Sequence, residues 1–89
     1  MLKINDRKTD VLDFLIKSVK YLLEIDHVTE NDDFFTLGGD SLTAIDLIAL
    51  IQKQYQIKLE LIVLFENRTL VDLSNAIIKK TSNNIERAN

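Results

Sequence analysis

The segment of this chain best suited to chemistry is a serine that follows a glycine pair. Gly38 and Gly39, the two glycines of the chain, immediately precede Asp40 and Ser41. Glycine allows positive φ and the close approach of another molecule. The serine then begins a predicted helix, where unpaired amide N–H groups and the positive end of the dipole favour a phosphate ester. The pattern therefore predicts an exposed, reachable serine that can hold a phosphodiester.

A simpler interpretation is that this serine only caps its helix, which is the commonest role of a serine at such a position. Asp40 or Ser41 can supply the capping oxygen. Ser18, Ser74 and Ser82 have no comparable surroundings, and we expect no function from them.

The rest of the chain predicts an all-α fold that positions this segment. There is no proline, and apolar residues recur at helical spacing. We expect helices over residues 10–24, 41–55, 60–65 and 70–80, the third of them short, with Thr9 or Asp10 capping the first and Thr69 the last. About sixteen residues, 25–40, form a long loop between the first two helices, and a connection of that length is often functional.

Apolar stripes indicate which side of each helix faces the core, and the loop aromatics Phe34 and Phe35, with Leu37, are expected to pin the loop to it. The expected core positions are Leu12, Leu15, Ile16, Val19, Leu22 and Leu23 on the first helix, Ala44, Leu47, Ile48 and Ile51 with Leu50 at the edge on the second, and Leu70, Leu73, Ala76 and Ile77 on the fourth. We divide the chain into an N-terminal extension, 1–8, a helical domain, 9–80, and a polar tail, 81–89, that we expect to fray.

The second helix is more apolar than one buried stripe needs. Either it is central and heavily buried, or it has a second face for partners. The second interpretation is physically reasonable, because a modest apolar patch rimmed by acids suits transient docking, and the family resemblance given below favours it. The residues expected on this outward face are Leu42, Ile45, Asp46 and Ala49, extended by Ile62 and Val63 of the third helix.

Composition excludes several classes of function. With 89 residues the chain is one domain, and its longest apolar runs, five residues each, are far short of the about 20 that a bilayer span needs. No cysteine is present, which is consistent with the reducing cytoplasm where we expect the protein, and one histidine gives no metal cluster. Seven acids and no Lys or Arg lie between Lys20 and Lys53, which argues against nucleic acid and favours a basic partner surface.

At the glycine pair the sequence resembles a known family. The string Leu37-Gly38-Gly39-Asp40-Ser41-Leu42 resembles the attachment motif of acyl and peptidyl carrier proteins, that is, the thiolation domains of nonribosomal peptide synthetases and the acyl carriers of polyketide and fatty acid synthesis. The segments 33–35 and 64–70 fit the same pattern, so that the resemblance covers about residues 10 to 80. It implies a four-helix bundle that catalyses no reaction itself and holds 4'-phosphopantetheine covalently at Ser41, with Gly39, Asp40 and Leu42 beside it.

The resemblance also implies the partners. A phosphopantetheinyl transferase, using coenzyme A and its own magnesium ion, would modify Ser41. The thiol of the cofactor would then carry acyl, aminoacyl or peptidyl groups, which explains how a chain without cysteine could hold thioesters. An adenylation or acyltransferase enzyme would load the carrier, and condensation, ketosynthase or tailoring enzymes of nonribosomal peptide or polyketide biosynthesis would use it. We expect a monomer, and Met1 favours a free-standing protein, although an excised domain would look the same.

The subtype stays open between peptidyl and acyl carriers. The two glycines followed by Asp-Ser look more like peptidyl carriers or carriers of hybrid pathways. Fatty acid carriers usually have an acid where this chain has Thr43. A further departure is Arg68, which lies where the family often has proline, so that the start of the fourth helix lacks that rigid residue.

Two alternatives compete with the carrier interpretation. Gly39-Asp40-Ser41-Leu42 matches a short signature of lipases and esterases, but the histidine of this chain, His27, precedes the serine, and the sequence predicts no parallel sheet. A helical interaction module without cofactor would explain the apolar second helix and the acidic window. It would not explain why both glycines precede one serine.

Overall fold

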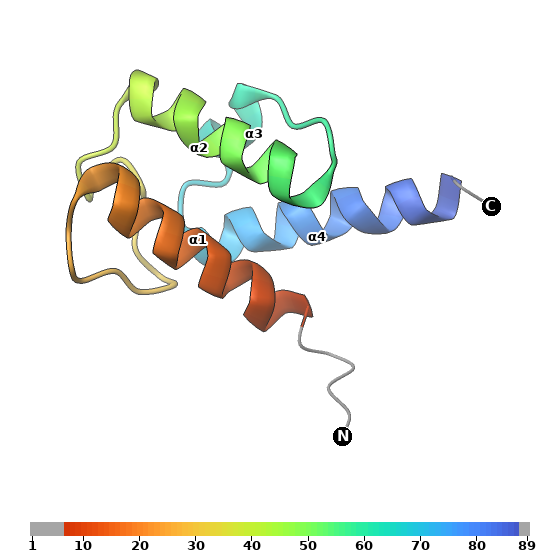
Figure 1. The fold of residues 1–89 in the computed structure, drawn as a ribbon, viewed down its shortest axis with the longest axis horizontal. Coiled ribbons are helices and arrows are strands. Elements are labelled where there is room, and N and C mark those ends of the chain that lie inside the picture. The colour runs from red at the N-terminus through yellow and green to blue at the C-terminus, as the bar shows by residue number, and fades with distance from the viewer. Residues whose placement is uncertain (1–6, 88–89) are drawn as a thin grey trace.

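Four helices make up the part of the chain that the computed structural model describes, residues 7–87, with side chains described for residues 7–82. They are α1 (Arg7–Leu23), α2 (Ser41–Tyr55), α3 (Leu61–Glu66) and α4 (Leu70–Arg87). Within these residues the backbone forms no strand, only an isolated bridge between Asp33 and Thr69. The predicted all-α bundle, with its short third helix and its long first loop, is confirmed (Figure 1).

The arrangement places the start of α2 at one end of the bundle. α1 ends and α2 begins at the same end, where the loop 24–40 joins them (Figure 1). α1 packs against α4 and α2, and the short α3 packs between α2 and α4. Both the first described residue of α1 and the last of α4 lie at the other end (Figure 1). Ser41 is therefore presented far from the ends of the described chain.

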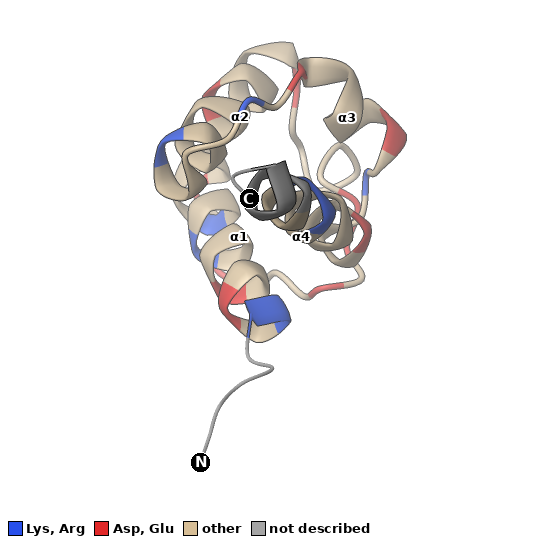
Figure 2. Ribbon diagram, turned by 90° about the vertical axis from the view of Figure 1, so that its right-hand side faces the viewer, with Lys and Arg blue, Asp and Glu red and all other residues tan. Residues whose placement is uncertain are grey.

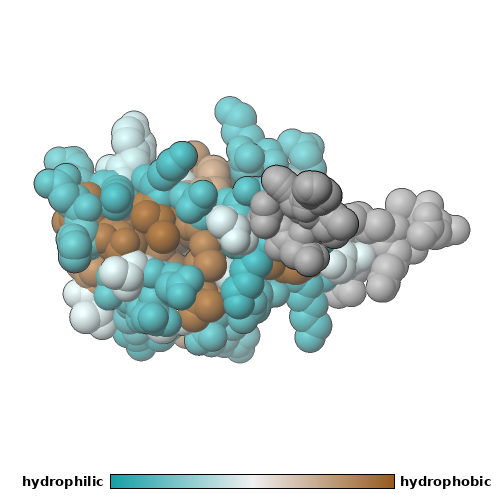
Figure 3. Space-filling model, turned by 90° about the horizontal axis from the view of Figure 1, so that it is seen from below, coloured by the Kyte–Doolittle hydropathy of each residue, from teal (hydrophilic) through white to brown (hydrophobic). Residues whose placement is uncertain are grey.

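The core includes the predicted stripes and also contains Val11, Val28, Ile57, Leu59 and Leu64, which the stripes did not include. Most of the predicted residues are buried, and Ile16, Leu22, Leu23, Leu50 and Ala76 are half-buried at its border. On the face on the α1 side, apolar residues form a band among hydrophilic ones (Figure 3). The side chains buried completely include Leu15 and Val19 of α1, Ala44, Leu47 and Ile51 of α2, Leu64 of α3, and Leu70, Leu73 and Ile77 of α4.

The long loop is fixed to this core, as predicted. Phe34 is completely buried, and Phe35 and Leu37 pack against the core from its edge. Hydrogen bonds also join the loop to the start of α4: the N–H of Phe34 donates to the carbonyl of Arg68 (2.9 Å), and that of Val71 donates to the carbonyl of Glu30 (2.9 Å). The loop is thus an ordered part of the bundle, although it belongs to no helix.

Two predicted helix ends are wrong. α1 begins at Arg7 rather than Asp10, so Thr9 and Asp10 lie inside the helix and do not cap it. α4 continues to Arg87 instead of ending at Lys80. α1 and α4 pack against each other, and near these ends the guanidinium of Arg7 donates to Thr81 Oγ1 (3.4 Å) and Ser82 Oγ (3.3 Å), so both helices have a partner beyond their predicted limits.

The other boundaries agree better with the sequence. α2 has the predicted bounds, and α3 is shifted by one residue. Thr69 caps α4, since its Oγ1 accepts the N–H of Asp72 (3.2 Å). The predicted polar tail is helical from residue 81 to 87, and residues 88–89 lie outside the described residues. Of the predicted extension, 1–8, residues 7 and 8 belong to α1, and residues 1–6 lie outside the described residues. No helix among residues 7–87 combines the length and the apolar character that crossing a membrane requires.

Candidate functional site

Ser41 is the first residue of α2 and is exposed. The preceding residue, Asp40, has extended backbone angles and caps the helix: its Oδ1 accepts the N–H of Thr43 (2.9 Å). In return, Thr43 Oγ1 accepts the N–H of Asp40 (2.9 Å), which completes a capping box. Of the two predicted capping residues, the structure therefore uses Asp40. The cap does not need the hydroxyl of Ser41, which leaves that group available for chemistry.

The two glycines before Ser41 are required for different reasons. Gly38 has φ +118°, a backbone conformation that other residues rarely adopt. Gly39 has an ordinary φ, but a Cβ atom at this position would collide with the ring of Phe34. From the sequence we expected the glycines to let another molecule approach closely. At Gly39 the group that approaches is instead the buried ring of Phe34, from the same chain.

Hydrogen bonds within the loop fix the turn that leads to Ser41. The N–H of Gly39 donates to the carbonyl of Phe34 (3.0 Å), and the N–H of Gly38 donates to that of Phe35 (3.1 Å). Earlier in the turn, Asp33 Oδ1 accepts the N–H groups of Phe35 (2.8 Å) and Thr36 (3.2 Å). The loop sequence thus supplies its own hydrogen-bond acceptors, which makes the position of Ser41 a property of the fold.

The charge of Asp40 follows from its role as the cap. The backbone N–H of Thr43, followed by its hydroxyl, holds the pKa of the Asp40 carboxyl below its ordinary value. At neutral pH a carboxylate therefore lies next to Ser41. Since it already uses the Thr43 amide, the helix start offers a phosphate ester fewer free N–H groups than the sequence analysis assumed. The site fits a group that is attached covalently and extends into solvent.

Acidic residues are concentrated in the part of the sequence that surrounds Ser41. The stretch between Lys20 and Lys53 has seven acids and no Lys or Arg. Figure 2 looks at the molecule from the end opposite the loop 24–40, where Lys and Arg residues on α1, α2 and α4 lie among Asp and Glu residues. Carboxylates therefore outnumber Lys and Arg around Ser41 in the sequence, which favours a basic partner.

Apolar side chains are exposed on α2 and α3 beside Ser41. The exposed fractions are 73% for Leu42, 52% for Ile45 and 53% for Ile62, and these values are high for such large apolar residues. Asp46 and Ala49 are exposed as well, while Val63 is half-buried and packs against the core. We call this surface the α2–α3 face; its residues are Leu42, Ile45, Asp46, Ala49, Ile62, Val63 and Phe65.

Phe65 is the member of the α2–α3 face that the sequence analysis missed. It is 41% exposed and lies three residues after Ile62, so both side chains emerge on the same side of α3. The spacing of these two residues was the available signal. Because all residues of the segment 61–65 are apolar, the sequence does not show which of them face the core and which are exposed.

Other kinds of site find no support in the described residues. Within residues 7–82, no three His, Asp or Glu side chains gather as metal ligands, and no pocket opens between the helices. His27, the base that the esterase alternative needs, is an exposed residue of the α1–α2 loop. The described part of the chain also lacks the parallel sheet of those enzymes.

Comparison with known families identifies the family of the chain. Residues 13–77, which include most of α1, the whole loop, α2, α3 and the first half of α4, match the family model described as phosphopantetheine attachment site. The chain belongs to this family. It is a carrier-protein domain of the kind found in nonribosomal peptide and polyketide systems, and 4'-phosphopantetheine is the cofactor of the family.

Individual carriers agree with this assignment in sequence and fold. Gramicidin S synthase 2 of Aneurinibacillus migulanus is 37% identical over 73 residues, which are 81% of this chain and 2% of the synthase. The type II acyl carrier protein BlmI of Streptomyces verticillus, involved in bleomycin biosynthesis, superimposes with a TM-score of 0.78 at 25% identity, over 82% of this chain and 88% of BlmI.

A second similar structure comes from the complex of the phosphopantetheine transferase Sfp with coenzyme A and a peptidyl carrier protein. The matching chain has a TM-score of 0.74 and 29% identity, over 78% of this chain and 90% of that chain. The curated relatives are much longer proteins, of which this chain spans between 1% and 5%. The resemblance is therefore to one domain of each.

Substitution of Gly39 tests the contact with Phe34. We expect Gly39→Ala to reduce the free energy of unfolding by about 1–3 kcal/mol, because the new methyl group overpacks a site filled by a buried ring. Denaturant unfolding followed by circular dichroism measures this change. Thr36→Ala, an exposed position of the same loop, should change the stability by less than about 0.5 kcal/mol. Equal stabilities of the two variants would contradict the contact.

The lowered pKa of Asp40 predicts a pH-dependent contribution to stability. A carboxyl group with a pKa lowered by folding stabilises the fold above its unfolded-state value, here 3.8, and this contribution is lost as the pH falls through the folded-state pKa. Asp40→Asn should therefore be less stable than the wild type at pH 7, and the difference should disappear in acid. Thermal denaturation of both proteins between pH 7 and pH 2 measures it. A difference that is the same at both ends of this range would show that the charge of Asp40 plays no part.

Proposed function

We propose that this domain holds acyl, aminoacyl or peptidyl intermediates on 4'-phosphopantetheine attached to Ser41 and presents them to enzymes of nonribosomal peptide or polyketide biosynthesis. The observation that carries the proposal is the exposed hydroxyl of Ser41 at the start of α2, directly after a turn that both glycines of the chain make possible. We assign this role to residues 9–80, and we expect the domain to act as a monomer.

The cofactor, when bound, supplies the thiol for thioester formation that a chain without cysteine lacks. The residues of this chain have other tasks. Ser41 Oγ is the atom that would be esterified, and the turn at Gly38 and Gly39 with the cap by Asp40 holds it in place. Leu42, the next exposed residue, would lie alongside the attached group. We propose no reaction catalysed by the domain itself, because these residues hold and present a group.

The α2–α3 face is the surface on which we propose that partners dock. It combines exposed apolar residues with the carboxylate of Asp46, and it lies beside Asp40 and Ser41, so a bound enzyme would have its active site close to the attached group. The proposed partners are the phosphopantetheinyl transferase, a loading adenylation or acyltransferase enzyme, and condensation, ketosynthase or tailoring enzymes. The similarity to a chain of the Sfp–coenzyme A complex supports the first of these.

Intact mass spectrometry tests the attachment. After incubation with coenzyme A, magnesium and a broad-specificity phosphopantetheinyl transferase, we expect the wild-type chain to gain one phosphopantetheine mass. Ser41→Ala should gain none, since no other serine has the same surroundings. Ser82→Ala, a half-buried serine of α4, is the matched control and should be modified like the wild type.

Failure of this experiment has a definite meaning. An unmodified wild-type chain would support the alternative of an interaction module without cofactor. Modification that persists in Ser41→Ala would keep the carrier role but assign the cofactor to a different residue.

Charge substitutions on the α2–α3 face test docking. We expect Ile45→Asp and Ile62→Asp each to lower kcat/KM of the transferase for the carrier by about tenfold, which corresponds to about 1.4 kcal/mol of lost docking energy. Tyr21→Asp is the matched control: Tyr21 is 79% exposed on α1, outside the face, and receives the same new charge. Rates of modification followed by mass spectrometry measure the effect. Equal losses in all three variants would contradict a specific face.

A further inference from the structure

Four side chains from three segments meet beside the loop that leads to Ser41. Asp33 and Phe35 belong to the loop, Phe65 to α3, and Arg68 to the connection between α3 and α4. We call them the Arg68 cluster. Neither the capping of α2 nor the proposed docking explains why a guanidinium should lie here.

Arg68 contacts two residues of the loop at once. Its Nε lies 3.0 Å from Asp33 Oδ2, and the centre of its guanidinium lies 5.1 Å from the ring centroid of Phe35. The other oxygen of the carboxylate, Oδ1, is the acceptor for the N–H groups of the loop turn. The carboxylate of Asp33 therefore joins the turn to the guanidinium, which a planar, multi-donor side chain is well suited to hold.

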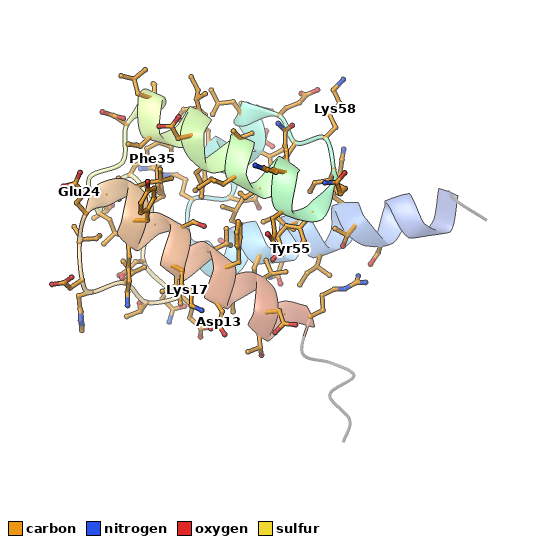
Figure 4. The ribbon with its side chains drawn as sticks, in the orientation of Figure 1. Asp13, Lys17, Glu24, Phe35, Tyr55 and Lys58 are labelled. Atoms are coloured by element: carbon orange, nitrogen blue, oxygen red, sulfur yellow. The ribbon has the colours of Figure 1, made fainter. Side chains whose placement is uncertain are left out.

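The ring of Phe35 extends the cluster to α3. It stacks on Phe65 with centroids 4.9 Å apart and an angle of 8° between the planes, and it meets Phe34 edge to face at 5.2 Å. Figure 4 shows Phe35 at the end of the bundle where the loop joins α1 to α2. Since Phe34 in turn underlies Gly39, an unbroken series of contacts leads from Arg68 to the residue two positions before Ser41.

Backbone hydrogen bonds connect the same residues. Phe34 donates its N–H to the carbonyl of Arg68 and accepts the N–H of Gly39 with its own carbonyl. A displacement of the segment 33–35 would therefore move the turn at Gly39. Arg68 is well placed to prevent such a displacement, because both its carbonyl and its side chain hold that segment.

We propose that Arg68 is a positioning residue for the modification of Ser41: it holds the loop in the conformation that the transferase binds. This inference rests on the proposed function of Ser41. The Arg68 and Asp33 side chains are 52% and 28% exposed, and an ion pair so accessible to water contributes little to global stability. Its loss should instead allow the loop to open locally while the bundle stays folded.

Local opening has a distinct kinetic signature. If only the closed loop binds the transferase, the apparent KM for the carrier rises by the reciprocal of the closed fraction, while kcat at saturation is unchanged. A variant that merely unfolded the bundle would show a lowered midpoint of thermal denaturation. The split between KM and kcat, measured well below that midpoint, separates the two effects.

The experiment compares Arg68→Gln, Arg68→Lys and Asp33→Asn as full chains. Arg68→Gln keeps the apolar stem and removes the charge, and Asp33→Asn keeps an Oδ1 acceptor for the turn. We expect each to raise KM about threefold with unchanged kcat, and the double variant to be no worse than either alone, because both remove the same contact. Arg68→Lys, which keeps the charge but not the planar group over Phe35, should lie between Arg68→Gln and the wild type.

Lys58→Gln is the control for the loss of a positive charge. Lys58 is exposed at the end of the bundle opposite Phe35 (Figure 4), and its replacement should leave KM unchanged. Nuclear magnetic resonance gives an independent readout: the amide signal of Gly39 should shift in Arg68→Gln and not in Lys58→Gln.

The outcomes are distinguishable. A wild-type KM and an unmoved Gly39 signal in Arg68→Gln would overturn the positioning role and leave the proposed function intact, as would an equal rise of KM in Lys58→Gln. A lowered kcat at unchanged KM would also overturn it. If the wild-type chain is not modified at all, or Ser41→Ala still is, the proposed function itself fails.

Discussion

The burial of Phe34 is the constraint on which the geometry of the site depends. A loop residue contributes one of the largest completely buried side chains of the core, and three different parts of the molecule meet at it. Its ring fills the space that a side chain at Gly39 would need, its N–H bonds to the α3–α4 connection, and its carbonyl holds the turn. An exposed hydroxyl on a small domain is thereby placed by the core, which is the most rigid part of the structure.

Those parts of the fold that depend on local pattern could be predicted from the sequence. The bounds of α2 follow from Asp40 and Thr43 ahead of an apolar stripe, and its inward and outward faces follow from helical spacing alone. The burial of Phe34 was predictable, because an aromatic pair in a polar loop is expected to pack against the core. The position of Ser41 at a helix start could be predicted from the adjacent capping residue alone.

The sequence could not reveal features that arise between segments. The contact of Arg7 with Thr81 joins α1 to α4 across 74 positions of the sequence, and no pattern within a single helix contains it. Position 39 requires glycine because of the ring of a residue five positions earlier, and the stack of Phe35 on Phe65 depends on how α3 packs. Of the α2–α3 face, Phe65 was the residue not predicted, because the spacing within α3 left its exposed side ambiguous.

The fastening of the loop to the start of α4 has a consequence for the order of events during synthesis. The loop bonds to the α3–α4 connection and the first turn of α4, partners more than thirty positions later in the chain. While the ribosome is still making α2 and α3, those partners do not exist, and the serine segment has only the hydrogen bonds of its own turn and of the helix cap. The segment can reach its final conformation only after about residue 71 has left the exit tunnel. A nascent chain halted before Arg68 would therefore carry an unfastened loop, and a ribosome-bound series of increasing length would show when the segment becomes ordered.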